Sequence, residues 1–425
     1  MRMGKAMPTS LPADGGIVDG HGGRAVVVRR WHRRYEVAVS IRPVAPPLDE
    51  LRRRTSAKWS THPDDVLPLF IAEMDYPLAP VVADAIIDRV RASDIGYAAT
   101  SGSAGEAFAG FADRRWGWRV DPADVNSTTD VSVVIVESLR VAISPGDGVV
   151  LMPPVYPPFF ELIPEAGGRV VEVPLLEERG SSSTTWRMDL AGIERALAAG
   201  ARAVLLCHPH NPLGLVHDAT DLARLADLAA AHGATVVSDE IHAPLVHPGV
   251  EFVPFLAVSD TARDVGVAAH SASKAFNLAG AKCALTVVAS DRGRALIARQ
   301  PDEVRYRTSI LGRAAAEAAL AHGDEWLDAT LEVIGENFDL LEQLLAQHLP
   351  TVRYTRPEAS YLAWLDFRET GLGDDPGLVI LDKARVALHY GHAFGNPGAG
   401  FVRLNVACSA DVLTEAIRRI AGVVH

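Results

Sequence analysis

The chain has 425 residues, which suits two domains, and its hydrophobic share of 48% is enough for a large buried core. The net charge of −12 argues against general binding to nucleic acid or to anionic membrane surfaces, so no nucleic-acid partner is expected. No apolar run reaches the length of a membrane-spanning helix, so no membrane partner is expected either. Cys207, Cys283 and Cys408 lie in or near apolar runs without metal-site spacing. We expect reduced thiols in a cytoplasmic protein, and no metal site.

The first 47 residues differ from the rest of the chain. They are rich in Gly, Arg and Val and contain a basic cluster at 29–34. They lack the apolar segment of a secretory signal peptide. We expect a disordered extension; the alternatives are a tail that contacts an acidic partner, or translation from a start codon upstream of the natural one.

The remaining residues are predicted to form an α/β fold with two domains. The smaller domain takes residues 48–90 and 315–425, and the larger takes residues 91–314. Mostly parallel strands are expected near 148–152, 169–173, 203–207, 234–238, 265–269 and 283–289. Amphipathic helices are expected at 218–232, covering the sheet, and at 325–348, bridging the domains.

Two of these strands end in polar residues that suit a binding site. The apolar run 204–207 leads into His-Pro-His-Asn-Pro-Leu-Gly, a turn that puts the amide of Asn211 at the strand's carboxyl end. The run 234–238 ends at Asp239, at the edge where parallel α/β sheets bind ligands.

A third strand ends in a lysine. The run 265–269 leads into His-Ser-Ala-Ser-Lys, so Lys274 stands between small hydroxyl residues at the mouth of a buried strand. A lysine there is poorly solvated but well placed to form a Schiff base with a carbonyl cofactor such as pyridoxal phosphate (PLP). The alternative is an exposed lysine that merely ends a strand.

These three motifs, in this order and about 30 residues apart, resemble the fold type I PLP-dependent enzymes of the class I/II aminotransferase superfamily. The resemblance implies PLP as cofactor and a PLP-dependent transferase-like fold, with a mostly parallel large-domain sheet and a smaller discontinuous domain. It implies that Lys274 carries the cofactor and shuttles a proton, that Asp239 pairs with the pyridinium nitrogen, and that Asn211 lies beside the ring oxygen O3′. His242 stands where many relatives have a tyrosine that binds O3′.

The same resemblance implies a phosphate site. It assigns this site to Ser271, Ser273 and the backbone amides of Val131 and Ser132, where a helix is expected to begin. Lys282 stands where many relatives have a phosphate-binding arginine. The alternative for Lys282 is an ordinary surface lysine.

Two tyrosines and an arginine complete the implied site. Tyr156 resembles the aromatic residue that stacks on the pyridine ring. Tyr97 resembles a tyrosine that reaches the cofactor phosphate of the neighbouring subunit, which implies a homodimer with shared active sites; core packing is the alternative for both. Arg403, in the strand-like run 400–407, matches the residue that grips the substrate α-carboxylate through its forked guanidinium, so a small amino-acid substrate is implied.

Further segments are similar to the MalY/PatB-type cystathionine β-lyases. These segments are 67–77, 238–242, 323–327 and 357–368, and the resemblance covers residues 48–425. It implies a C–S β-lyase that cleaves cystathionine or another L-cysteine S-conjugate to thiol, pyruvate and ammonia.

The chain departs from that pattern near the expected substrate. Leu213 replaces the usual threonine after the Asn-Pro turn, and His389 and Tyr390 replace asparagine and proline. We expect Tyr390 to contact the substrate; these residues could serve an unusual conjugate or simply pack differently. Open alternatives are an aminotransferase and an antibiotic-pathway enzyme that acts on S-conjugated cysteine by elimination or by oxidative decarboxylation–deamination. A PLP-binding regulator is the alternative from another class.

Overall fold

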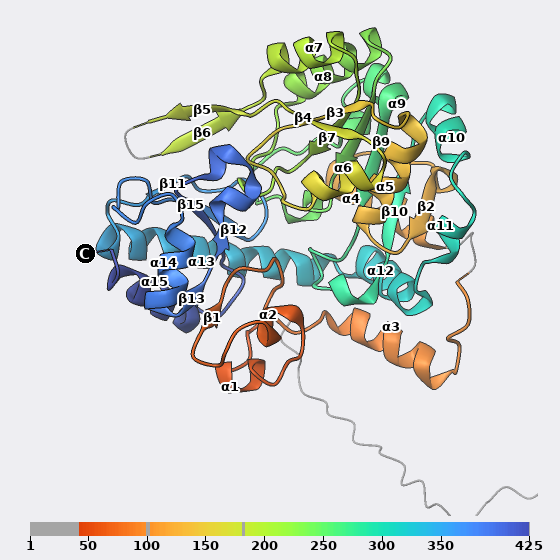
Figure 1. Ribbon diagram of the computed structural model, residues 1–425. Coiled ribbons are helices and arrows are strands. Elements are labelled where there is room, and N and C mark those ends of the chain that lie inside the picture. Colours follow the sequence, from red (N-terminus) through yellow and green to blue (C-terminus); the bar gives the residue numbers. More distant parts are fainter. Residues whose placement is uncertain (1–41, 99–102, 181–182, 425) are drawn as a thin grey trace, which may run out of the picture. The chain divides into compact units, whose positions relative to one another are not determined.

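The computed structural model describes residues 42–98, 103–180 and 183–424 (Figure 1). Most of the predicted N-terminal extension, residues 1–41, lies outside these ranges. The expected boundaries of a small and a large domain stay a prediction.

A seven-stranded sheet forms the centre of the fold. Its order is β2 (Val125–Thr128), β10 (Ala284–Val287), β9 (Gly266–His270), β8 (Thr235–Asp239), β7 (Ala201–Cys207), β3 (Gly148–Leu151) and β4 (Arg169–Glu172). The five strands from β9 to β4 are parallel, whereas β10 runs antiparallel to both of its neighbours. The six expected strands are confirmed. β2 is not among the predicted strands, because its Val-Asn-Ser-Thr sequence is short and polar and forms a half-buried edge.

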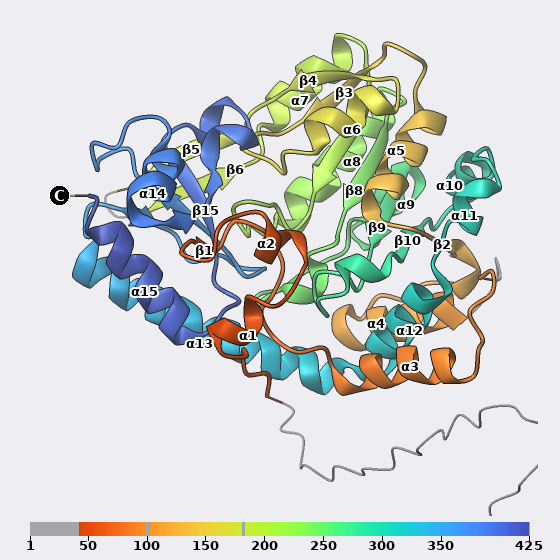
Figure 2. The same cartoon turned by 60° about the horizontal axis from the view of Figure 1, so that its bottom comes forward.

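Helices cover both faces of this sheet (Figures 1 and 2). α5 (Val131–Ala142) and α6 (Phe159–Glu165) share an apolar cluster with Val149 and Leu151 of β3. Val150 points to the opposite face, into a cluster with α7 (Leu190–Ala198), α8 (Ala219–Ala231) and α9 (Asp260–Val265). Burial on both faces explains why the parallel strands read as continuous apolar runs. The expected helix at 218–232 is confirmed as α8.

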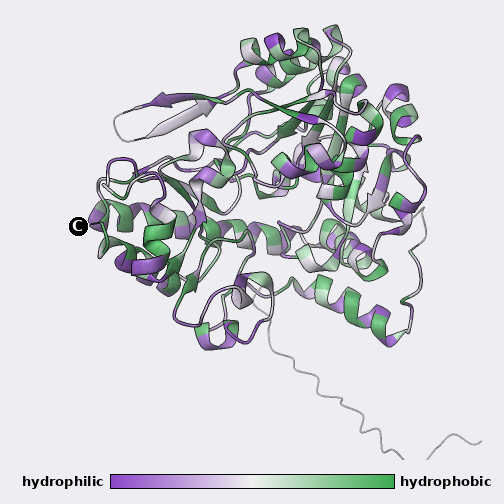
Figure 3. Cartoon of the chain, viewed as in Figure 1, coloured by the Kyte–Doolittle hydropathy of each residue, from purple (hydrophilic) through white to green (hydrophobic). Residues whose placement is uncertain are grey.

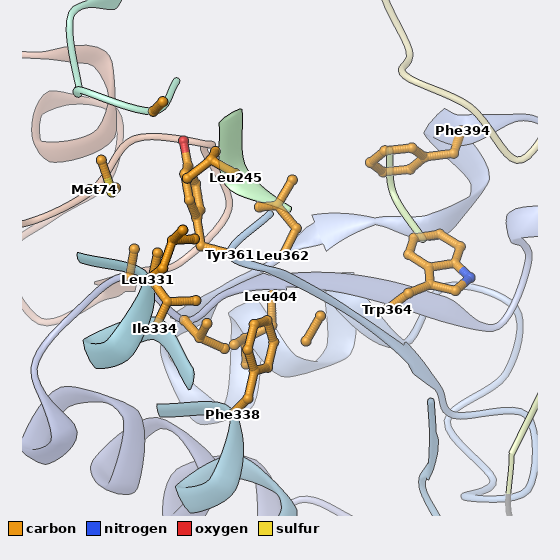
Figure 4. Packing of buried hydrophobic residues seen from close by; sticks show 14 of the residues in the cluster. Met74, Leu245, Leu331, Ile334, Phe338, Tyr361, Leu362, Trp364, Phe394 and Leu404 are labelled. Carbon is orange, nitrogen blue, oxygen red and sulfur yellow. The ribbon is translucent and has the colours of Figure 1, made fainter. Parts of the chain in front are cut away.

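A second sheet is antiparallel and carries the C-terminal part of the chain. Its order is β11 (Arg353–Tyr354), β12 (Leu362–Asp366), β15 (Phe401–Asn405) and β14 (His389–Tyr390). The expected long helix is confirmed as α13 (Asp324–His348), and its Ile334 and Phe338 pack near Leu404 (Figure 4). α14 (Pro376–Ala384) and α15 (Ala410–Ala421) also pack in this part of the fold.

The remaining elements are short or peripheral. β1 (Leu67–Pro68) pairs with β13 (Val386–Ala387), and β5 (Leu176–Arg179) pairs with β6 (Thr184–Arg187) in a hairpin that is mostly hydrophilic (Figure 3). The other helices are α1 (Leu48–Leu51), α2 (Ala57–Ser60), α3 (Pro80–Arg91), α4 (Ser103–Trp116), α10 (Asp291–Ile297), α11 (Glu303–Tyr306) and α12 (Ile310–His322). Among the described residues, no helix combines the length and the apolar character needed to cross a bilayer.

Candidate active site

A cavity of about 200 Å³ opens at the carboxyl ends of β7, β8 and β9, beside the start of α5. This is the edge at which parallel α/β sheets bind ligands. Most of the residues predicted from sequence line it together: Val131, Ser132, Tyr156, Asn211, Asp239, His242, Ser271, Ser273, Lys274 and Lys282.

Lys274 follows β9 and extends its amine into this cavity. Its Nζ donates a hydrogen bond to the carbonyl of Ala72, at 2.9 Å. Burial, and next the positive charge of Arg403, lower the pKa of Lys274 to about 8. The lowered pKa makes the uncharged amine, which a nucleophile or a proton acceptor requires, much more available near neutral pH than in an ordinary lysine.

Asp239 is a buried carboxylate at the end of β8. Its Oδ1 accepts a hydrogen bond from the backbone N–H of Ile241 at 3.1 Å, and no described cation forms an ion pair with it. Burial raises the pKa of Asp239 to about 7, although the Ile241 N–H and the charge of Lys274 oppose this rise. A cationic ligand group beside Asp239 would lower this pKa again and keep the carboxylate negatively charged.

Asn211 and His242 leave polar atoms for a ligand. Asn211 accepts a hydrogen bond from Nη1 of Arg403 through its Oδ1, at 2.9 Å, so its amide NH₂ is the group left for the cavity. The Nδ1 of His242 is buried and has no hydrogen-bond partner among the described residues. Burial, then Lys274 and Arg403, lower the pKa of His242 to about 3, so its imidazole is neutral.

The opposite end of the cavity is the N-terminus of α5. The N–H groups of Val131 and Ser132 have no backbone acceptor in the described structure, as expected for a first helical turn. Asp130 caps the helix by accepting from Val133 N–H, and its other oxygen lies 3.2 Å from Nζ of Lys282. Helix dipole, free N–H groups and a lysine together favour an anion here.

Ser271 and Ser273 differ in how available they are to that anion. The hydroxyl of Ser271 donates to the Cys283 carbonyl at 2.7 Å and accepts from the N–H of Ser273 at 3.1 Å. Its hydrogen-bonding capacity is thus largely used within the loop. Ser273 lines the cavity, and its hydroxyl makes no hydrogen bond to another described residue.

Arg403 lies beside the cavity and is 3% exposed. Its guanidinium donates to Asn211 Oδ1, to the Phe70 carbonyl and to Nδ1 of His389, and its Cζ lies 5.0 Å from the ring centroid of Phe394. All of these groups are neutral, and Nε has no partner among the described atoms. Burial lowers the pKa of Arg403 to about 10. A buried cation without an anionic partner is costly, so the arrangement favours an anionic ligand.

Two predicted residues are not brought to the cavity. Tyr97 is 95% exposed and lies outside its lining. Tyr390 pairs with Val402, packs against Gly377 and stacks on His392 at 5.9 Å, and it also lies outside the lining. Successive strand residues point to opposite faces, so Tyr390 turns away from the face that carries Arg403.

The structure adds site residues that were not singled out from sequence. His389 stands directly across from Arg403 in the sheet and accepts its hydrogen bond, and the carbonyls of Phe70 and Ala72 accept from Arg403 and Lys274. Because neighbouring strand residues point to opposite faces, the sequence could have indicated that only one of His389 and Tyr390 faces the site. No local signal in the sequence reports the two carbonyls, because every residue has one. Within the described residues, no group of three or more His, Cys, Asp or Glu side chains is arranged to hold a metal.

A known protein family matches most of this chain. The model of aminotransferase class I and II matches residues 64–420. The chain belongs to this family. Its relatives include cystathionine β-lyase of Corynebacterium glutamicum, which is 36% identical over 385 residues, covering 89% of this chain and 99% of the relative. Cystathionine β-lyase PatB of Bacillus subtilis is 33% identical over 377 residues, covering 86% and 95%.

Solved structures agree with this assignment. The structure of cystalysin from Treponema denticola, which contains pyridoxal 5′-phosphate, superposes with a TM-score of 0.82 at 26% identity, covering 88% of this chain and 96% of that one. The expected fold type I architecture and the MalY/PatB-type relationship are therefore confirmed.

Proposed function

We propose that the protein is a PLP-dependent C–S β-lyase that cleaves cystathionine or another L-cysteine S-conjugate to a thiol, pyruvate and ammonia. The observation that carries the proposal is the buried Lys274 amine in one cavity with the unpaired carboxylate of Asp239 and the start of α5. The cystathionine β-lyases among its relatives support the same activity.

The residues of the cavity fit PLP. Asp239 needs a cationic partner, which a protonated ring nitrogen supplies, and the α5 N–H groups with Ser273 and Lys282 suit a phosphate. Asn211 and the unpartnered Nδ1 of His242 offer hydrogen bonds for the ring oxygen. Tyr156 supplies an aromatic wall, and Lys274 an amine for covalent attachment.

When bound, PLP supplies an aldehyde that takes up an amine and a protonated ring that withdraws electrons from the substrate Cα. Lys274 accepts the Cα proton, because its lowered pKa leaves the amine uncharged in a useful fraction of molecules near neutral pH. With PLP bound, the electrons left at Cα would form a Cα–Cβ double bond as the Cβ–S pair leaves on sulfur, and water would then convert the remaining enamine to pyruvate and ammonia. Once it holds this proton, Lys274 would also be the group that can return it.

Arg403 binds the substrate α-carboxylate in this mechanism. Only a carboxylate satisfies both its charge and its forked geometry, while Asn211, His389 and Phe70 hold the guanidinium in place without neutralising it. His389 must be neutral to accept this hydrogen bond at Nδ1. Burial and the charge of Arg403 lower the pKa of His389 to about 3, consistent with that role.

We also propose a homodimer in the cytoplasm, with Tyr97 of each subunit acting at the partner's phosphate site. Tyr97 is exposed, and so are the apolar side chains of Ile87, Val90 and Ile95 that precede it. Such a group of exposed apolar residues suits contact with a second copy. Cys207, Cys283 and Cys408 are buried free thiols, in keeping with a reducing compartment.

The test is an assay of the purified, PLP-loaded protein with L-cystathionine and with S-methyl-L-cysteine, without any keto acid. Pyruvate and free thiol are measured together. Equal amounts of the two products, formed over many turnovers, are the expected result. A change in the cofactor spectrum without pyruvate would contradict elimination, and a requirement for added keto acid would identify an aminotransferase.

A further inference from the structure

A second cavity, of about 160 Å³, shares no lining residue with the first. It lies between the β5–β6 hairpin and one face of the antiparallel sheet. Trp186 and Thr184 of the hairpin form one wall, and Trp364 of β12 and Phe401 of β15 form the other, with Leu213 and Pro357 at its edge. The hairpin leaves the central sheet and extends toward β11 and β15 (Figures 1 and 2).

Polar contacts hold the hairpin over this cavity. Arg368 donates to Glu177 at 2.5 Å, Arg179 to Glu369 at 3.0 Å, and Thr355 exchanges two hydrogen bonds with the backbone of Thr184. Most residues of the hairpin are hydrophilic (Figure 3). Their polar side chains and backbone groups make the contacts that join the hairpin to the antiparallel sheet around the cavity. The cavity is thus framed by specific contacts between distant parts of the chain.

The aromatic rings that line the cavity contact one another. Trp364 and Phe401 stack with a centroid distance of 5.1 Å and an angle of 6°, and Arg368 covers Phe401 at 4.5 Å. Trp186 meets Phe401 edge-on at 6.2 Å. The cavity is thus bordered by the flat rings of Trp186 and Trp364, which favours a flat ligand.

Three buried polar atoms of lining residues lack partners among the described residues: Nε1 of Trp364 and the hydroxyls of Thr184 and Tyr354. The indole Nε1 of Trp364 and the hydroxyl of Thr184 are buried and make no hydrogen bond to any described residue, and each residue is 7% exposed. In Figure 4 the indole nitrogen lies on the ring edge that faces away from Tyr361 and Leu362. An indole N–H can only donate, so a ligand that satisfies it must carry an acceptor.

From these observations we propose that this cavity is a binding site for a small, flat, single-ring molecule that carries a hydrogen-bond acceptor. The volume of about 160 Å³ matches a single ring, since an apolar cavity of about 150 Å³ holds one benzene. Here Arg353, Arg356, Glu358 and Asp366 also line the cavity, which suits a ring that carries a polar group better than a bare hydrocarbon. The ring packs against the indole of Trp186, and its oxygen accepts a hydrogen bond from the in-plane N–H of Trp364 and makes a second hydrogen bond with the hydroxyl of Thr184.

This site is distinct from the substrate site but adjoins it. Trp364 meets Phe394 at 5.1 Å, and Phe394 lies beneath the guanidinium of Arg403 at 5.0 Å. Neither Lys274 nor Arg403 lines this cavity, so its ligand contacts neither of them. Binding can be measured without reference to the lyase reaction, so failure of the proposed activity and failure of this site are separate results.

The experiment uses the PLP-loaded protein with phenol and toluene, followed by ligand-observed NMR and calorimetry. Phenol has a ring and an oxygen, whereas toluene has a similar size but no acceptor. We expect saturable phenol binding that Trp364→Phe weakens by about tenfold, because one buried hydrogen bond is lost, and toluene binding that this change weakens much less, because toluene loses only packing contacts.

Two further variants make the outcome decisive. Thr184→Val, which keeps the side-chain shape, should also weaken phenol but not toluene, and it answers the question if Trp364→Phe does not fold. Trp59→Phe is the matched control, because Trp59 is also a buried tryptophan with an unpartnered Nε1 but lies in α2. Equal phenol affinity in the wild type, Trp364→Phe and Thr184→Val would overturn the proposal, as would the absence of saturable binding.

Discussion

Asp239 and Arg403 are buried groups of opposite charge, and neither is neutralised by an oppositely charged residue within the described structure. Burying an isolated charge destabilises a folded protein unless a partner arrives. A ligand that pairs with these two groups therefore gains binding free energy by removing this destabilisation. Three predictions at the scale of single residues follow from this arrangement.

Lys274→Ala is expected to abolish both the visible absorbance of the loaded protein and its turnover, because it removes the amine that attaches the cofactor. Lys282→Ala is the matched control, since Lys282 lines the same cavity but pairs with Asp130. It should weaken cofactor binding without removing the visible band. Absorbance spectra and pyruvate release measure both effects, and normal turnover in Lys274→Ala would refute the mechanism.

Asp239→Asn is expected to stabilise the cofactor-free protein at pH 8. The folded-state pKa of Asp239 is raised to about 7, so its stabilising effect is complete below its ordinary range near 4 and is lost as the pH rises through 7. Asparagine mimics the protonated acid and removes this loss, raising the free energy of unfolding by a few kcal/mol at most. Cofactor affinity and the rate of Cα deprotonation should fall.

Glu240→Gln is the control for that change. Burial raises the pKa of Glu240 to about 8, yet Glu240 does not line the cavity. Its substitution should alter the stability of the free and loaded proteins alike and leave cofactor affinity unchanged. Chemical denaturation between pH 5 and 8, with and without PLP, separates the two variants. Asp239→Asn with unchanged cofactor affinity would disprove the assigned role.

Arg403→Ala is expected to raise KM strongly, by about 2–5 kcal/mol in apparent binding free energy, because the substrate carboxylate loses a desolvated partner. Arg403→Lys should recover only part of this loss, since lysine cannot reproduce the fork. Arg418→Ala, an exposed arginine on α15, serves as control. Steady-state kinetics give the answer; an unchanged KM in Arg403→Ala would mean that another group holds the carboxylate.

At the scale of elements, the N-terminus of α5 carries an acidic cap where an anion is expected. Asp130→Asn keeps the capping hydrogen bond to Val133 but removes the negative charge and frees Lys282. We expect tighter cofactor binding, by several-fold at low ionic strength. Asp218→Asn is the control, because Asp218 caps α8 in the same manner by accepting from Thr220 N–H. Weaker binding in Asp130→Asn would place the phosphate elsewhere.

The elements that build the cavity could be predicted from sequence because their signals are local. A buried parallel strand followed by Asn211, Asp239 or Lys274 identifies both the element and the edge to which its side chain belongs. The role of His389 could not be read in this way, since it depends on the register of β14 against β15. The same holds for the Phe70 carbonyl, which accepts a hydrogen bond from Arg403 although the two residues are 333 positions apart in the sequence. The aromatic cavity under the β5–β6 hairpin was missed for the same reason.

At the scale of the whole molecule, the proposed dimer predicts complementation between two inactive variants. Lys274→Ala and Tyr97→Ala should each lose most activity. When the two are mixed and allowed to exchange subunits, each mixed dimer contains one site with both residues intact. About one quarter of wild-type activity should return, because half of the dimers are mixed and half of their sites are complete. No recovery despite proven exchange would show that Tyr97 does not act across subunits.

The segment 69–75 ties the beginning of the described chain to its end. Asn405 N–H donates to the Leu69 carbonyl, Asp75 N–H donates to the Ala407 carbonyl, and the carbonyl of Ala72 between them receives Lys274. The ribosome makes residues 69–75 early in synthesis and their partners, residues 405–407, near its end. The contacts that hold the acceptor of the lysine in place therefore require β15, which is among the last strands to be synthesised. A nascent chain that stops short of this strand contains Lys274 and the start of α5 but lacks Arg403 and the partners of segment 69–75, so we expect premature termination to yield a protein without activity.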